Sequence, residues 1–187
     1  MRLISIVGHS GSGKTTLIEK LIAELTRRGL RVATLKHAHH TVQLDTPGKD
    51  SWRYTQAGAA LSMLVTGEGV QLIARQVESR EPQVLAQRFM GDADVVLAEG
   101  FSHAPGPKIE VLRRACSATP RCTLDDGLIA LVSDVDEAHA QLPHFALDDV
   151  SGIVEFILNR SIRGEPDGAA SHSTKPTSGQ VAGYVEP

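Results

Sequence analysis

The residue types best suited to chemistry occur near the amino terminus, in the stretch Gly8-His9-Ser10-Gly11-Ser12-Gly13-Lys14-Thr15. This stretch fits the pattern G-x-x-x-x-G-K-[ST] at every fixed position, which is the Walker A phosphate-binding loop. Its glycines permit backbone angles and close approaches that a Cβ forbids, so successive N–H groups can turn inward around an anion. An apolar run at 3–7 precedes the loop and helical spacing follows it, which is the strand, loop and helix context that the motif requires.

The loop predicts a role for each of its polar groups. The N-terminus of the following helix favours a bound phosphate through its unsatisfied N–H groups and its dipole. Lys14 is expected to reach the β- and γ-phosphates, and the Thr15 hydroxyl is expected to bind Mg²⁺. The predicted nucleotide-binding residues here are Gly8, His9, Ser10, Gly11, Ser12, Gly13, Lys14, Thr15 and Thr16.

Acidic residues lie at or just beyond the ends of three predicted strands. Glu99 ends the apolar run 94–99 as a Walker B acid would, although aspartate is commoner there, and can bind Mg²⁺ or polarise a nucleophile. Asp45 follows the second strand and is a candidate for holding Mg²⁺ or orienting an attacking water, or it is only a turn residue. Asp134 follows a later strand and is either a reader of guanine N1–H and N2–H₂ or a turn residue, because the usual Asn-Lys-x-Asp context is missing.

A histidine cluster, Lys36-His37-Ala38-His39-His40, follows the second predicted strand. Three imidazoles in four residues can bind a transition metal. Lys36 or the histidines can instead contact phosphates or the anionic ligand of a partner. Solvated loop histidines are the third alternative, and the residues leave all three open.

The apolar patterns predict an α/β fold of the P-loop NTPase type, with a mainly parallel sheet flanked by helices. Two short strands around Gly67-Glu68-Gly69 predict an antiparallel hairpin added to that sheet. The run at 108–113 alternates like a strand with one polar face. Asp50 is a candidate for holding Mg²⁺ but is expected to cap a short helix, and Asp148-Asp149 are expected to cap a final one. The main strands are expected at 3–7, 30–35, 94–100, 108–113 and 127–134.

Composition separates one folded domain at 1–160 from a polar tail at 161–187, which has few large apolar residues and is predicted to be disordered. The net charge of −3 and the sparse basic clusters argue against a nucleic-acid partner. No apolar run approaches the length of a membrane span and no leader pattern occurs, so a cytoplasmic protein is expected. Cys116 and Cys122 lack zinc-site spacing and are expected to be reduced thiols.

Taken together, these motifs resemble the molybdopterin-guanine dinucleotide biosynthesis protein B family, MobB. The resemblance covers roughly residues 1–134 and implies a dimeric protein that binds GTP with Mg²⁺, hydrolyses it weakly, and assists MobA. MobA is the molybdenum cofactor guanylyltransferase that converts molybdopterin to its guanine dinucleotide form. The motifs that carry the resemblance are Gly8 to Thr16, Lys36 to His40, Asp45-Thr46-Pro47-Gly48-Lys49-Asp50-Ser51, Leu97-Ala98-Glu99-Gly100-Phe101 and Lys108-Ile109-Glu110-Val111.

Two functions from different classes fit these features. One is a GTP-binding accessory protein, and the other is a P-loop kinase that phosphorylates a nucleoside or another small molecule. A kinase usually needs a lid with several arginines, which neutralise the transferred phosphoryl group and exclude water. The arginines at 113, 114 and 121 follow a strand rather than a lid helix, so the accessory protein is favoured.

Overall fold

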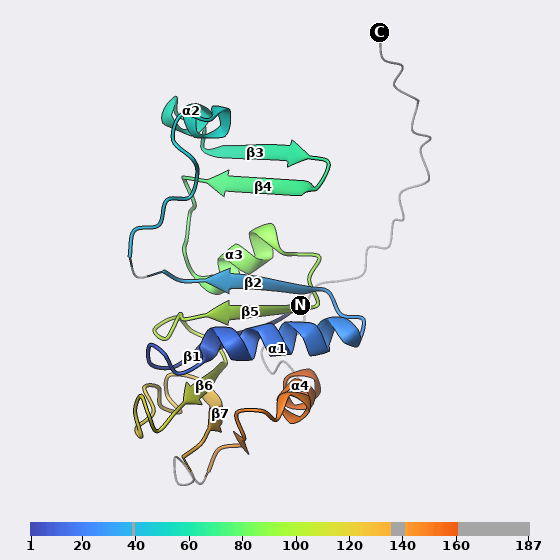
Figure 1. Ribbon diagram of the computed structural model, residues 1–187, viewed down its shortest axis with the longest axis vertical. Coiled ribbons are helices and arrows are strands. Elements are labelled where there is room, and N and C mark those ends of the chain that lie inside the picture. The colour runs from blue at the N-terminus through green and yellow to red at the C-terminus, as the bar shows by residue number, and fades with distance from the viewer. Residues whose placement is uncertain (39, 136–140, 161–187) are drawn as a thin grey trace, which may run out of the picture.

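The structure is a computed structural model that describes residues 1–38, 40–135 and 141–160. A six-stranded sheet with the order β2-β5-β1-β6-β7-β8 forms its centre, and every neighbouring pair in it is parallel. A two-stranded antiparallel sheet, β3-β4, stands apart from it (Figure 1). The predicted α/β class with its antiparallel hairpin is confirmed. The strands of the large sheet are β1 (Arg2–Val7), β2 (Val32–Lys36), β5 (Val95–Glu99), β6 (Lys108–Leu112), β7 (Leu128–Ser133) and β8 (His144–Phe145).

Helices cover both faces of this sheet. Helices α1 (Lys14–Arg27) and α4 (Val150–Asn159) contact each other, and their buried residues share a core with β1, β5, β6 and β7. Helix α3 (Pro82–Phe89) packs Ala86 against Leu3 and Val96 of the other face. Because alternate residues of a strand point to opposite faces, a strand between two helical layers needs apolar residues at nearly every position. The apolar runs of the sequence identified these strands for that reason.

The hairpin corrects one expectation. Strands β3 (Leu61–Thr66) and β4 (Gly69–Ala74) pair with each other, as predicted, but not with the large sheet that the prediction attached them to. Figure 1 shows the hairpin and helix α2 (Asp50–Gln56) beyond the β2 edge of the sheet. An alternating pattern specifies that two strands pair but does not specify which sheet they join.

Strand β6 corrects a second expectation from the sequence. The alternation at 108–113 predicted one polar face, but all five residues of β6 are buried. The Lys108 ammonium donates to the carbonyl oxygens of Ala104 at 2.6 Å, Gly106 at 3.4 Å and Asp126. The Glu110 carboxylate accepts backbone N–H groups from Arg121 and Cys122. A charged side chain can be buried when backbone groups satisfy it, and sequence alternation alone does not reveal that.

Helix ends gave mixed results. Asp149 caps α4, as predicted, by accepting the backbone N–H of Gly152 at 3.0 Å. The predicted cap at Asp50 is wrong, because Lys49 is the N-cap residue of α2 and Asp50 lies in the first turn, 3.6 Å from Arg53. After the turn residues Pro47 and Gly48, the helix cap falls at Lys49, one residue before Asp50. The short strand β8 was not predicted, since two residues carry no periodicity.

Three remaining expectations concern the whole chain. Cys116 and Cys122 are free thiols, as predicted. In the part of the chain that the structure describes, no helix is long and apolar enough to cross a membrane. The tail at 161–187 lies outside the described residues.

Candidate functional site

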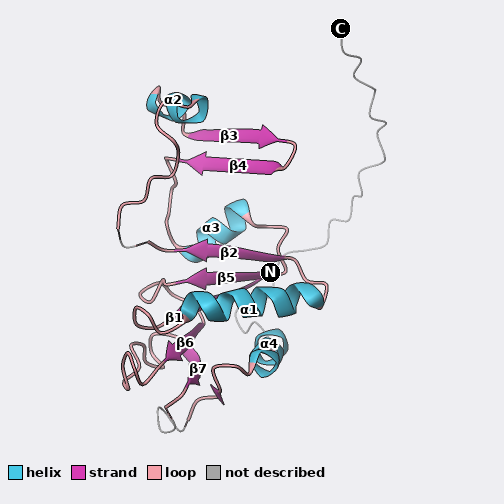
Figure 2. Cartoon of the chain, viewed as in Figure 1, coloured by secondary structure: helices cyan, strands magenta, loops and turns pink. Residues whose placement is uncertain are grey.

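The predicted phosphate loop leaves the carboxyl end of β1, which lies at the middle of the sheet between β5 and β6. Gly8 has φ +135°, and a Cβ there would overlap the Val111 carbonyl oxygen, so strand β6 packs directly against the loop. Gly13, with φ +97°, is the N-cap residue of α1. The arrowheads of β2 and β5 in Figure 2 point to the side where α1 begins. This is the edge at which open α/β sheets bind ligands.

Lys14 folds over this loop. Its Nζ donates to the carbonyl oxygens of Gly8 at 3.0 Å and His9 at 2.7 Å. Burial lowers the pKa of the Lys14 ammonium from its ordinary value; Glu99 raises it, while Arg121 and Lys36 lower it further. Other cations therefore lie close enough to affect Lys14 electrostatically, as they do in sites that hold a strongly charged anion.

Thr15 and Glu99, which the sequence predicted as metal ligands, lie together. The Thr15 hydroxyl donates to Glu99 Oε2 at 2.9 Å, and Lys36 Nζ is 3.2 Å from Glu99 Oε1. The strand register explains this cluster, because Glu99 is level with Ile6 of β1 and with Lys36 of β2. A hydroxyl and a carboxylate oxygen at the end of a phosphate loop fit the preference of Mg²⁺ for oxygen ligands.

Asp45, the other predicted metal and catalytic residue, lines a different cavity. Its Oδ1 accepts the backbone N–H of Thr46 at 2.7 Å, and its Oδ2 is buried without a hydrogen-bond partner. That cavity, of about 540 Å³, is also lined by Trp52, Arg75 and Arg80, on the side of the hairpin, and no residue of the phosphate loop lines it. The structure therefore does not place Asp45 with Thr15 and Glu99, and its role at the nucleotide stays a prediction.

Asp134 lies just after β7, at the same edge of the sheet as the phosphate loop. Its Oδ1 accepts the backbone N–H of Arg114 at 2.7 Å, so it ties the segment after β6 to the end of β7. The side chain is exposed. The turn-residue alternative thus has a contact in the structure, and guanine recognition stays a prediction.

The other loop residues differ in exposure. The Ser12 hydroxyl is buried under the loop, 3.0 Å from the Cβ position at Gly8, and has no hydrogen-bond partner. His9 is partly exposed, and Ser10 and Thr16 are exposed. The side chains of Ser10 and Thr16 are accessible at this edge, whereas that of Ser12 packs inward.

Sequence reasoning did not assign the segment 113–122 to the site, although this segment approaches the phosphate loop. Arg113 Nη2 lies 3.6 Å from the point that a Cβ on Gly13 would occupy, and Cys116 Sγ lies 3.8 Å from the corresponding point at Gly11. The signal was present as arginines grouped directly after a strand that neighbours β1. It was set aside because a lid was expected to be a helix.

The histidine cluster is only partly described. The backbone N–H of His37 donates to the Glu99 carbonyl oxygen at 3.0 Å, and its ring lies 5.2 Å from that of Phe101. Among the described residues, no group of three His, Cys, Asp or Glu side chains is placed to hold a metal ion. His39 lies outside the described residues, so the three alternatives for the cluster stay open.

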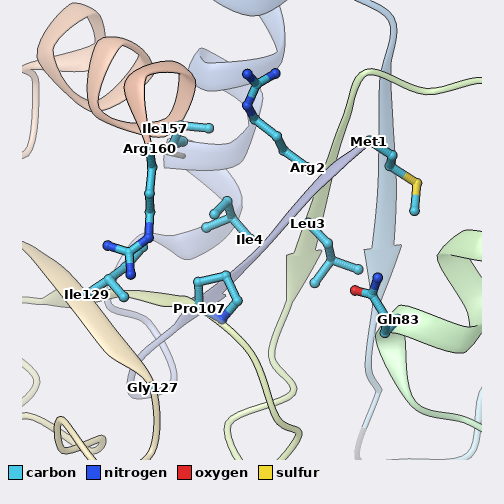
Figure 3. A pocket seen from close by; sticks show the side chains of 10 residues that line it. All are labelled: Met1, Arg2, Leu3, Ile4, Gln83, Pro107, Gly127, Ile129, Ile157 and Arg160. Carbon is cyan, nitrogen blue, oxygen red and sulfur yellow. The ribbon is translucent and has the colours of Figure 1, made fainter. Parts of the chain in front are cut away.

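A cavity of about 600 Å³ opens at the opposite edge of the sheet (Figure 3). Arg2 begins β1, while Pro107 and Gly127 directly precede β6 and β7, so these lining residues mark the amino edge. Apolar side chains such as Ile129 and Ile157 contribute to its wall. It is therefore separate from the phosphate loop.

The central β1, its glycine-rich loop and the helix that follows define a P-loop α/β protein. Residues 3–134 match the family model "MobB: Molybdopterin guanine dinucleotide synthesis protein B", and the chain belongs to this family.

Relatives and solved structures agree with this assignment. The chain is 41% identical over 133 residues to the molybdopterin-guanine dinucleotide biosynthesis adapter protein of Haemophilus influenzae, covering 71% of this chain and 74% of that protein. It is 34% identical over 160 residues to the adapter protein of Escherichia coli, covering 83% and 91%. The crystal structure of Bacillus subtilis MobB is similar with a TM-score of 0.64 at 29% identity, covering 84% and 96%.

Proposed function

We propose that this protein is a GTP-binding adapter in the biosynthesis of molybdopterin guanine dinucleotide, which assists a MobA-type guanylyltransferase. The observation that carries the nucleotide part is the grouping of Lys14, Thr15 and Glu99 at the end of β1. The adapter part is supported by the names of the relatives, at 34–41% identity for the two bacterial proteins above.

In this proposal the chain's own groups divide the work of binding. The loop amides and the Lys14 ammonium hold the phosphates, and the Thr15 hydroxyl and Glu99 carboxylate hold Mg²⁺. When bound, Mg²⁺ screens the charge of the phosphates. Glu99 orients water for slow hydrolysis, joined by Asp45 if the segment before α2 closes over the nucleotide. Asp134 accepts hydrogen bonds from guanine.

Partners are proposed at two surfaces. The molybdopterin held by the transferase can face Lys36 and His37, at the end of β2, and the loop 102–107 after β5, across the carboxyl edge. The hairpin exposes Met63, Val65 and Val70, which supports self-association into a homodimer. A cytoplasmic location is part of the same proposal, as is the absence of a nucleic-acid or membrane partner.

A reconstituted assay tests the proposal. Molybdopterin, Mg²⁺-GTP and the transferase are combined with and without this protein, and with the Lys14→Ala variant. The protein alone is expected to make no dinucleotide, the parent is expected to accelerate the transferase, and Lys14→Ala is expected not to. Equal acceleration by parent and variant would show that assistance does not depend on the nucleotide.

A P-loop kinase is the second candidate, and the position of Arg113 beside the phosphate loop favours it. A kinase needs such cations around the transferred phosphoryl group. Transfer of the γ-phosphate from labelled ATP or GTP to a nucleoside or cofactor precursor, without the transferase, would support the kinase over the adapter.

A further inference from the structure

The segment 113–122, between β6 and β7, carries three arginines. Arg113 and Arg121 are exposed, and neither guanidinium has an acidic partner within ion-pair distance in the part of the chain that the structure describes. Exposed arginines are common, so position must decide whether these two have a function. The Arg113 guanidinium lies beside the phosphate loop, and the charge of Arg121 acts on Lys14 of that loop.

Arg113 has its side chain next to the N-terminus of α1. Its carbonyl oxygen accepts the backbone N–H groups of Cys116 at 2.8 Å and Ser117 at 2.9 Å, which closes a turn on this residue. Its guanidinium carbon lies 3.9 Å, and its Nη2 lies 3.6 Å, from the Cβ position at Gly13. The guanidinium thus lies beside the amides that the motif assigns to phosphate.

Arg121 is held on the same side by a different anchor. The fully buried Glu110 carboxylate accepts the backbone N–H groups of Arg121 at 2.6 Å and Cys122 at 2.9 Å. Glu110 is level with Val7, the residue before the phosphate loop. The charge of Arg121 also contributes to lowering the pKa of Lys14. By accepting two backbone hydrogen bonds, one buried carboxylate fixes the main chain from which the Arg121 side chain extends.

The anchors explain how a segment without a helix holds its main chain in place beside the phosphate loop. Asp134 binds the backbone of Arg114, the turn closes on Arg113, and Glu110 binds the far end. Cations of this segment therefore face the phosphate loop, and guanidinium groups suit phosphate oxygens because their N–H groups form a fixed fork.

We propose that segment 113–122 forms a second wall of the nucleotide site, in which Arg113 and Arg121 bind the polyphosphate chain of a nucleoside triphosphate in cis. This inference rests on the proposed nucleotide site at the phosphate loop, but not on the transferase. It assigns the phosphate contacts to residues outside the Walker A pattern. It also assigns Glu110 to holding the segment, through the main chain of Arg121.

Titration calorimetry with Mg²⁺-GTP and Mg²⁺-ATP on the full chain tests this wall. The variants Arg113→Gln and Arg121→Gln are each expected to weaken binding roughly ten- to hundredfold, because each removes a charge-assisted contact. Arg114→Gln is the matched control, since it removes the same charge from the same segment and only its main chain has an anchoring contact. Arg114→Gln is expected to change affinity less than about threefold. Thermal melts establish that each variant is folded.

The loss must be similar for both nucleotides, because the arginines contact phosphates and not the base. A loss confined to GTP, or an equal loss in Arg114→Gln, overturns the proposed wall. Parent-like affinity in both Arg113→Gln and Arg121→Gln overturns it too, while leaving the adapter function intact if Lys14→Ala still abolishes binding. A parent that binds neither nucleotide overturns both proposals, whereas a failure to accelerate the transferase affects only the adapter function.

Discussion

The parallel sheet and the β3–β4 hairpin are built from similar apolar residues, but these residues differ in how far the chain buries them. In the sheet, all residues of β6 and β7 are buried, between helices and loops of the same chain. In the hairpin, only Ser62 and Ile73 are buried, and these two residues pair with each other across the strands. A two-stranded ribbon is marginally stable without a packed face. We therefore expect the sheet to be stable with the cover that its own chain provides, whereas the stability of the hairpin depends on what packs against its exposed faces.

The largest effect expected from this difference is on stability. Leu131→Ala, at a position with no exposed surface, is expected to lower the free energy of unfolding by about 2–5 kcal/mol, because it leaves a cavity in β7. Val65→Ala, at a position 68% exposed, is expected to change it by less than about 0.5 kcal/mol. Urea denaturation, repeated at several protein concentrations, measures both. A large loss in Val65→Ala that grows with protein concentration would show that the hairpin is buried between two copies.

The second effect concerns the two predicted catalytic acids, which the structure assigns to the two regions. Glu99 ends a sheet strand and binds the Thr15 hydroxyl, whereas Asp45 lines the hairpin-side cavity. Glu99→Gln is expected to slow GTP hydrolysis about tenfold or more while retaining nucleotide binding. Asp45→Asn is expected to slow it only if the segment before α2 closes over the nucleotide. Single-turnover hydrolysis measures both, and parent-like rates in both variants would remove the two acids from the γ-phosphate.

A smaller effect is expected at Asp134, on the sheet side. If this carboxylate accepts hydrogen bonds from guanine, Asp134→Ala reduces the preference for GTP over ATP by about tenfold. The reduction comes from weaker GTP binding, and ATP affinity stays constant. If instead the affinities for GTP and ATP fall together, Asp134 acts by holding the main chain of Arg114, and other residues recognise guanine.

The smallest effect is expected from the tail. Ending the chain at Arg160 removes mainly polar residues and is expected to change neither the melting temperature nor GTP affinity. A decrease of several degrees in a thermal melt would show that the removed residues contact the folded domain and would add a third region to the comparison.

The sequence predicted those parts of the fold in which a local pattern of residues is compatible with only one local structure. Apolar runs identified β1, β5 and β7, and the Walker A octet identified the turn into α1, because their physical requirements are local. The environment of β6 was missed because Lys108 is satisfied partly by the Asp126 carbonyl, and Glu110 by the N–H groups of Arg121 and Cys122, all outside the strand's own stretch of sequence. The approach of Arg113 to Gly13 depends on which strand neighbours β1, so no window of sequence contains it. Thr15 and Glu99 were each predicted to bind Mg²⁺; the structure brings them together because their motifs meet at one sheet edge, and their binding of Mg²⁺ stays a prediction.

The buried Lys108 ammonium has a consequence for local opening. Its carbonyl partners belong to the loop before β6 and to the loop before β7, so a single charged group joins two turns that are about twenty residues apart. If either turn opens alone, it leaves a buried cation with fewer partners, which costs more than the loss of an ordinary hydrogen bond. The two turns should therefore open as one cooperative unit, and the amides of this edge should exchange with solvent together.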